Sequence, residues 1–268
     1  GFESIRQLEV DRRTDAGDLA ALQEGIEHVL GDVRAAVGDW STMRARLAEI
    51  TAGMAAVPAS IDAGEAQEVR AFLDWLAADN FVLLGCRDYA LVEGGEGNEL
   101  RIVPESGLGL LRGEGEDGQS RSFAALPPQL RAQAHLPRLL TVTKSNSRST
   151  VHRPGYLDFI GIKTFGADGK VSGERRVIGL LASTAYSASP RQIPLLRHKV
   201  DAVFERASLL PGGHAAKALQ TLLERYPRDE LFQIDADELY AHAMGILRLG
   251  ERLRTRLFVR VDPFARFV

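Results

Sequence analysis

Two long apolar segments joined by Asp168-Gly169 constrain the fold of this chain more than any other feature. An Asp-Gly pair between hydrophobic runs is a strong signal for a β-hairpin. With these two residues as the turn, Ala167 faces Lys170. The resulting register matches charge with charge and apolar with apolar side chains: Lys163 with Glu174, Ile160 with Val177, and Phe159 with Ile178.

The second segment of the hairpin is apolar on both faces at its centre, residues 177–181. A strand of this kind is typical of the middle of a sheet that is covered on both sides. Residues 80–103 show the same period of two around a Gly-rich turn, and a further strand pattern precedes the hairpin. The sequence therefore predicts five strands: 80–92, 100–103, 139–145, 156–165 and 171–182.

Helical periodicity flanks these strands on both sides. The first predicted helix follows Asp15 or Asp18. Its apolar residues recur at helical spacing: Leu19, Leu22, Ile26, Val29, Leu30, Val33 and Val37. A second begins near Ser41 as its cap, and a third covers 65–79. After the strands, helices are predicted from Pro194, over 215–226, and after Asp235 or Asp237, and a short one is predicted within 124–134.

The fold class is therefore α+β: a PAS-like five-stranded antiparallel sheet flanked by N- and C-terminal helices. The PAS comparison concerns the fold alone and carries no function. Strand patterns at 4–11 and 256–261 have no partner strand next to them, so we expect the chain ends to cut through strands of neighbouring modules.

Composition excludes several classes of function. The net charge of −3 gives no general electrostatic attraction to nucleic acid or membranes. No apolar run reaches the roughly 18 residues of a membrane span. The single cysteine, Cys86, cannot form an intrachain disulfide and fits a reducing compartment. We expect a cytoplasmic location, with no nucleic-acid or membrane partner.

Motifs for catalysis and cofactor binding are mostly absent. A literal G-x-G-x-x-G occurs at Gly113, Gly115 and Gly118, but acidic residues lie between the glycines and no capped apolar helix follows, so we reject a dinucleotide site. No Walker A, G-x-S-x-G or H-E-x-x-H pattern occurs, and the six histidines lack metal-ligand spacing. We predict no catalytic residues, no cofactor and no metal in this chain.

One group of basic residues stands out before the hairpin. Lys144, Arg148, His152 and Arg153 surround Ser149, and we expect them in a loop at one end of the sheet. Such a loop can bind a carboxylate or phosphate through charge-assisted hydrogen bonds. It can equally bind acidic residues of the following helices, such as Asp229 and Glu230. The sequence leaves both readings open.

Four stretches together resemble one family: 80–89 (NFVLLGCRDY), 143–154 (TKSNSRSTVHRP), 189–197 (SPRQIPLLR) and 226–232 (YPRDELF), and residues 256–264 agree. They are similar to the region N-terminal to the catalytic domain of the large NAD-dependent bacterial glutamate dehydrogenases. The resemblance implies a homo-oligomeric parent enzyme that converts L-glutamate, NAD and water to 2-oxoglutarate, ammonium and NADH. It also implies ACT-type and PAS-like modules in this region.

The resemblance predicts five parts. Residues 1–14 would end a preceding ACT-like module, 15–79 form a helical linker region, 80–188 a PAS-like or ACT-type regulatory domain, 189–255 a helical region, and 256–268 the start of a following ACT-like module. NAD would bind only elsewhere in the parent. The expected partners are other domains and subunits of the parent and an amino-acid effector.

Two roles compete within that family. One is a regulatory segment that binds an allosteric effector, and the other is an assembly segment. A free-standing PAS-type small-molecule sensor and a purely structural oligomerisation module are the alternatives. A polar concave pocket favours binding, whereas broad apolar surface favours assembly.

Overall fold

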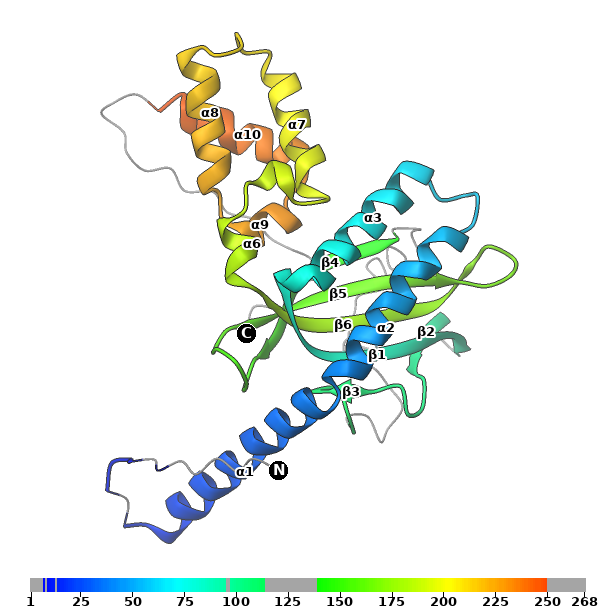
Figure 1. Cartoon of the computed structure of the whole chain (residues 1–268), viewed down its shortest axis with the longest axis vertical. Coiled ribbons are helices and arrows are strands. Elements are labelled where there is room, and N and C mark those ends of the chain that lie inside the picture. The colour runs from blue at the N-terminus through cyan, green and yellow to red at the C-terminus, as the bar shows by residue number, and fades with distance from the viewer. Residues whose placement is uncertain (1–6, 8, 13, 95–96, 114–138, 250–268) are drawn as a thin grey trace.

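The computed structural model of this chain describes residues 7, 9–12, 14–94, 97–113 and 139–249. Its centre is an antiparallel sheet with the strand order β2-β1-β6-β5-β4, and helices precede and follow it (Figure 1). The strands are β1 Phe81–Gly94, β2 Gly97–Ile102, β4 Leu140–Arg148, β5 Tyr156–Phe165 and β6 Val171–Leu181. A two-residue strand, β3 Leu108–Gly109, pairs with β1. The predicted α+β class with five main antiparallel strands is confirmed.

Strand β6 lies between β1 and β5, as its apolar sequence predicted. Val177, Ile178, Leu180 and Leu181 are all buried. Gly179 lets β1 approach, because a Cβ at this position would lie 2.1 Å from the carbonyl oxygen of Val82. The centre of the sheet thus depends on apolar side chains and on one position without a side chain.

The hairpin register is confirmed, but the predicted turn is wrong. Lys163 pairs with Glu174, Ile160 with Val177, and Phe159 with Ile178. Ala167 does not pair with Lys170: the Gly166 amide donates to the Lys170 carbonyl, which leaves a three-residue turn closed by Gly169 at φ 75°. A left-handed glycine at this position is typical of three-residue hairpin loops. A register shift between Thr164 and Phe165 restores the predicted pairing.

The helices before the sheet are α1 Ala16–Gly38, α2 Trp40–Gly53 and α3 Ala63–Trp75, with short turns η1 Met54–Ala56 and η2 Leu76–Asn80. The side chains of Asp15 and Asp62 cap α1 and α3. The prediction that Ser41 caps the second helix is wrong, since α2 already begins at Trp40. Asp39 occupies the cap position, but its buried carboxylate instead accepts from the Gly109 amide at 2.8 Å and pairs with Arg112.

After the sheet, the described residues up to 249 are mostly helical. The elements are α6 Ser183–Ser187, η3 Pro190–Gln192, α7 Leu196–Ala207, α8 His214–Arg225, α9 Arg228–Gln233 and α10 Ala236–Leu247. Asp235, one of the two predicted caps, accepts from the Glu238 amide. The short helices α6 and α9 were not predicted, because five or six residues carry too little periodicity.

Helices α2 and α3 lie across one face of the sheet (Figure 1). Their buried side chains, including Met43, Leu47, Phe72 and Leu73, share one core with the sheet and with α7, α8 and α10. A smaller cluster around Leu84, Leu157, Ile178 and Leu180 includes Ala36 at the end of α1. Residues 40–75 therefore form part of the sheet's own core.

Several predictions fall outside the described residues: the helix within 124–134, the strand at 256–261, two glycines of the rejected motif and half of the strand at 4–11. The described half of that last segment, residues 7 and 9–11, is not in a strand. None of the helices in the described part combines the length and apolar character that a bilayer span requires.

Candidate functional site

The basic residues singled out in the sequence do not all lie in a loop. Lys144 and Arg148 belong to strand β4, which extends further than predicted because β4 pairs with β5 as far as Arg148. His152 and Arg153 follow in a tight turn, which is closed by a hydrogen bond from the Ser149 amide to the Gly155 carbonyl. Ser149 is buried, and its Oγ donates to the Val151 carbonyl at 2.6 Å. Ser149 is thus a structural residue of the turn.

Lys144 has two acidic partners within the chain. Its Nζ lies 2.7 Å from Asp158 Oδ1 on the facing strand β5 and 3.3 Å from Asp229 Oδ1 in α9. Burial lowers the pKa of Lys144, but the hydrogen bond and the charges of these carboxylates raise it above its ordinary value overall. Burial raises the pKa of Asp158, and Lys144 offsets that rise only in part. Lys144 therefore links β4, β5 and the helical region.

The other basic side chains have different neighbours. Arg153 donates from Nη2 to the Leu181 carbonyl at 3.0 Å, and its guanidinium lies 5.8 Å from the Tyr186 ring centroid. Tyr186 donates to Asp229, which also pairs with Lys144, so Arg153 and Lys144 are connected through Tyr186 and Asp229. Arg148 instead lies 5.0 Å above the ring of Tyr156, the residue opposite it on β5. His152 is exposed at φ 67°.

The sequence reasoning missed a second set of polar contacts between the sheet side and the helical region. Glu68 of α3 accepts from the Leu195 amide at 2.7 Å and from Arg197 Nε at 2.9 Å, and it lies 3.2 Å from His198 Nε2. Burial raises the pKa of Glu68, but its bonds to Arg197 and Leu195 outweigh burial, so the pKa is lowered. The Phe72 and Phe232 rings, 5.5 Å apart, add an apolar contact between α3 and α9.

Helix α9 and the residues on either side of it are also held in place by cationic side chains that donate to backbone carbonyls. Lys199 donates to the carbonyls of Leu231, Phe232 and Ile234 at 2.8–2.9 Å. The buried Arg228 donates to the carbonyls of Tyr226, Ala188 and Glu224. We call the contacts of Lys144 and Glu68 the sheet–helix junction, because they connect the sheet and α3 to the helical region. Lys199 and Arg228 instead hold the helical region itself together.

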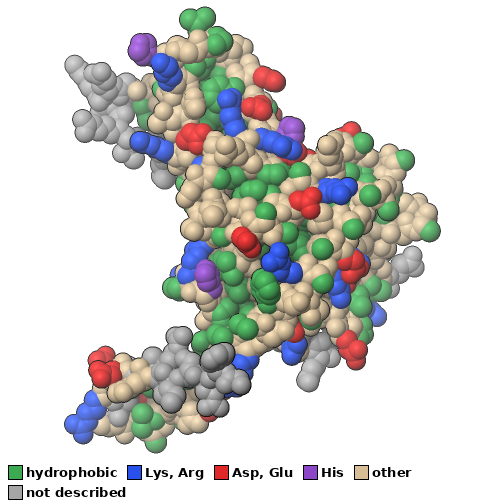
Figure 2. Space-filling view, in the orientation of Figure 1, with side chains coloured by type: hydrophobic (Ala, Val, Ile, Leu, Met, Phe, Trp, Pro, Cys, Tyr) green, Lys and Arg blue, Asp and Glu red, His purple; other side chains and the backbone are tan. Residues whose placement is uncertain are grey.

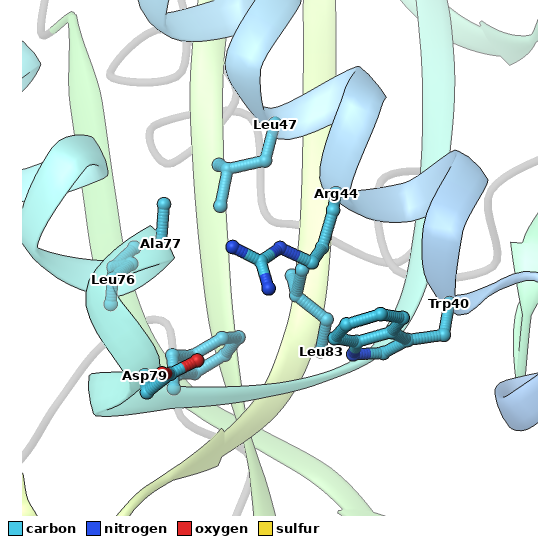
Figure 3. Close-up of a pocket in the computed structure, with 8 residues that line it drawn as sticks. Trp40, Arg44, Leu47, Leu76, Ala77, Asp79 and Leu83 are labelled. Atoms are coloured by element: carbon cyan, nitrogen blue, oxygen red, sulfur yellow. The ribbon is translucent and has the colours of Figure 1, made fainter.

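A small hollow lies between α2, η2 and β1 (Figure 3). Its cavity volume is only about 30 Å³, far below the several hundred Å³ of a ligand pocket. The guanidinium of Arg44 points into it above the Trp40 ring, and the Asp79 carboxylate lies on the opposite wall. Asp79 has φ 60°, a left-handed backbone conformation that costs free energy in a residue other than glycine.

The described residues offer no metal centre. They contain no group of three or more His, Cys, Asp or Glu side chains placed to hold a metal ion. Cys86 is buried in β1, and burial raises the pKa of its thiol to about 12, so the reactive thiolate is not formed at neutral pH. Cys86 is an apolar core residue.

Comparisons with known proteins agree with the resemblance. A family signature described as "Glutamate dehydrogenase, helical motif 1" matches residues 193–252, which include α7 to α10. The chain is 40% identical to an NAD-specific glutamate dehydrogenase of Halomonas elongata and 36% identical to one of Pseudomonas aeruginosa, in both cases over 99% of its length. An NAD-specific glutamate dehydrogenase of Mycobacterium tuberculosis is 28% identical over the same share.

The chain spans only 15–16% of the length of these relatives. The identity nevertheless extends from one end of the chain to the other, across the sheet and both helical regions. The chain therefore belongs, as one segment, to the family of large NAD-specific glutamate dehydrogenases.

Proposed function

We propose that this chain is a non-catalytic assembly and regulatory segment of a large NAD-dependent glutamate dehydrogenase. In this proposal the parent enzyme oxidises L-glutamate with NAD and water to 2-oxoglutarate, ammonium and NADH. Support comes from the similarity to NAD-specific glutamate dehydrogenases along 99% of the chain. The segment would act in the cytoplasm and contact other domains and subunits of the parent, and its PAS-like sheet would serve as the scaffold.

One observation favours assembly as the main role: helix α1 exposes an apolar face. Of its 23 residues only Ala36 is buried. Seven large apolar side chains remain 36–72% exposed, and this helix projects away from the sheet (Figures 1 and 2). A contiguous exposed apolar surface of this kind marks a protein interaction site. On the face shown in Figure 2, by contrast, basic and acidic side chains are interspersed, which does not resemble a nucleic-acid interface.

The assembly role is tested in the full-length enzyme with Ile26→Asp, which places a charge on the apolar face of α1. We expect a smaller oligomer in sedimentation velocity or a lower melting temperature, and reduced NADH production from glutamate. Glu24→Gln on the same helix is the control, because Glu24 is exposed outside the apolar face. Unchanged size, melting temperature and activity in Ile26→Asp would contradict the assembly role.

Effector binding is a second candidate, and the hollow of Figure 3 favours it. Arg44 can bind a carboxylate and Asp79 an ammonium group, while Leu47, Leu76 and Leu83 supply apolar walls. The two charges match those of a small zwitterion such as an amino acid, and the hollow of about 30 Å³ must widen to admit one. The test is the response of full-length Arg44→Ala to individual L-amino acids. A response equal to that of the wild type would exclude this hollow as the effector site.

A further inference from the structure

The exposed apolar side chains of α1 follow a heptad repeat. Leu19, Leu22, Ile26, Val29 and Val33 are separated by three, four, three and four residues. This spacing is the a and d pattern of a coiled-coil seam. Leu30 and Val37 lie beside the seam and widen it. The charged side chains Glu24, Glu27 and Arg34 fall at outer positions of the same repeat.

The repeat continues into α2, where it is used differently. Ala36, Trp40, Met43, Leu47 and Ile50 keep the same spacing, and the last three are 0–2% exposed against the sheet. Between the two helices lies only Asp39, whose carboxylate is bound to the Gly109 amide. Beyond this residue, α1 extends away from the sheet that covers α2 (Figure 1). Among the described residues, the α1 half of the seam is therefore left without a cover.

We propose that α1 pairs antiparallel with α1 of a second copy of this chain, a partner that rests on the assembly role proposed above. In an antiparallel pair each a residue packs against a d residue of the partner. The exposed seam residues at the centre of α1 are symmetric about the midpoint between Glu27 and His28. Leu22 then meets Val33 and Ile26 meets Val29, while Ala36 stays in the core of its own chain. One self-complementary face serves both subunits, as twofold symmetry requires.

The helix dipoles also favour the antiparallel direction. Asp15 and Asp18 lie at the N-terminal end of α1. A parallel pair would place these carboxylates of the two copies together, whereas an antiparallel pair separates them and opposes the two helix dipoles.

The expected contact is small. Complete burial of a Leu, Ile or Val side chain removes roughly 60–120 Å² of surface. About half of that remains available in α1, so fourteen side chains supply roughly 400–800 Å². Flanking side chains along a helix about 35 Å long bring the total near the ~1,000 Å² of a specific interface. The pair is therefore a weak dimer, which chemical crosslinking detects well.

Disulfide crosslinking of the 268-residue chain tests both the partner and the direction. Leu22→Cys and Val33→Cys are prepared separately, oxidised alone and after mixing in equal amounts, and examined on non-reducing gels. The mixture is expected to give a covalent dimer of twice 29.3 kDa from up to about half of the chains, and neither variant alone should do so. Both positions are more than one-third exposed, so these changes leave the core intact.

Matched controls are available in the same chain. The wild-type Cys86 is buried and should not crosslink. Glu24→Cys and Gly31→Cys would lie opposite each other along the antiparallel pair, but on the side of each helix that faces away from the partner. Their mixture should therefore stay monomeric. Ile26→Cys mixed with Val29→Cys repeats the experiment at the centre of the seam. Crosslinking of Leu22→Cys with itself would overturn the antiparallel direction.

Absence of crosslinks in both seam mixtures would overturn self-pairing. That result is distinguishable from failure of the proposed function. If Ile26→Asp still changes the full-length enzyme while the seam mixtures stay monomeric, another part of the enzyme covers α1. The assembly role then holds and the second copy is excluded.

Discussion

Lys163 and Glu174 face each other across β5 and β6, with Lys163 Nζ 2.7 Å from Glu174 Oε2, and both side chains are buried. Arg176 donates from Nε to the other oxygen of the same carboxylate at 2.6 Å. Its guanidinium lies 3.9 Å from the Tyr89 ring centroid and 5.4 Å from that of Phe159. One carboxylate thus neutralises part of a cluster that holds two buried cations, and its loss removes a charged partner from both of them.

Glu174→Gln is expected to lower the free energy of unfolding by about 3–5 kcal/mol at pH 7, because the buried Lys163 loses its carboxylate partner. Burial raises the pKa of Glu174, but Arg176 and Lys163 outweigh burial and lower it. Because the pKa of Glu174 is lower in the folded than in the unfolded state, the carboxylate stabilises the fold at any pH above its unfolded pKa of about 4.3. This stabilisation is lost as the pH falls through the folded pKa. The wild type should therefore lose more stability than the variant between pH 5 and pH 2, as urea unfolding would measure.

Arg175, the residue that follows Glu174 in β6, provides the control for this prediction. Arg175 pairs with Glu49 at 3.1 Å, and Glu49 is 60% exposed. Arg175→Ala should cost no more than about 1 kcal/mol, since solvent screens the pair. An equal loss in both variants would show that burial does not decide the strength of these pairs.

Lys144→Met is expected to destabilise the chain by about 3–5 kcal/mol, because it leaves the buried Asp158 carboxylate without its cation. Burial already raises the pKa of Asp158, and loss of Lys144 raises it further. A raised carboxylate pKa means that the folded state binds the proton more tightly, so the variant should recover part of the loss as pH falls. Lys170→Met, whose side chain is 85% exposed, is the control and should change stability by less than about 1 kcal/mol.

Asp229→Asn tests whether the sheet–helix junction holds the helical region in place. The change weakens the contacts of Asp229 with Lys144 and Tyr186 but leaves Lys144 paired with Asp158. We expect faster amide hydrogen exchange in α9 and α10, with unchanged protection in β5 and β6. Faster exchange throughout the sheet would instead mean that both parts open together.

Glycine substitutions separate a crowded position from an open one. A Cβ at Gly161 would lie 3.1 Å from Phe159 Cε1 and 3.2 Å from Glu174 Cδ, so Gly161→Ala should cost about 1–3 kcal/mol. A Cβ at Gly31 in α1 would have no atom within 4 Å, so Gly31→Ala should stabilise the chain by about 0.5–1 kcal/mol. Thermal unfolding of both variants measures the difference, and a loss at Gly31 would contradict the helical geometry of α1.

The sequence allowed the sheet to be predicted because its signals are local. Lys163 and Glu174 are eleven residues apart, and alternation on both sides of one turn fixes their register. The turn itself was mispredicted because a register shift near Thr164 compensates for an extra loop residue, and no sequence pattern marks such a shift. Glu68 and Arg197 are separated by 129 residues, and nothing near either residue identifies its partner. The seam of α1 was visible as periodicity, but only the fold shows that it is uncovered.

Arg148 provides the last test of the basic residues as an anion or partner site. It is exposed and lies above the Tyr156 ring, a contact that contributes about 0.5–1 kcal/mol at such positions. Arg148→Ala should therefore lower the free energy of unfolding by no more than about 1 kcal/mol. If Arg148 serves only this contact, oligomer size and effector response of the full-length enzyme should equal those of the wild type. Arg148→Lys keeps the charge but changes the stacking, so it separates the two contributions. A change in oligomer size or effector response in Arg148→Ala that Arg148→Lys restores would instead identify Arg148 as a contact for an anion or a neighbouring subunit.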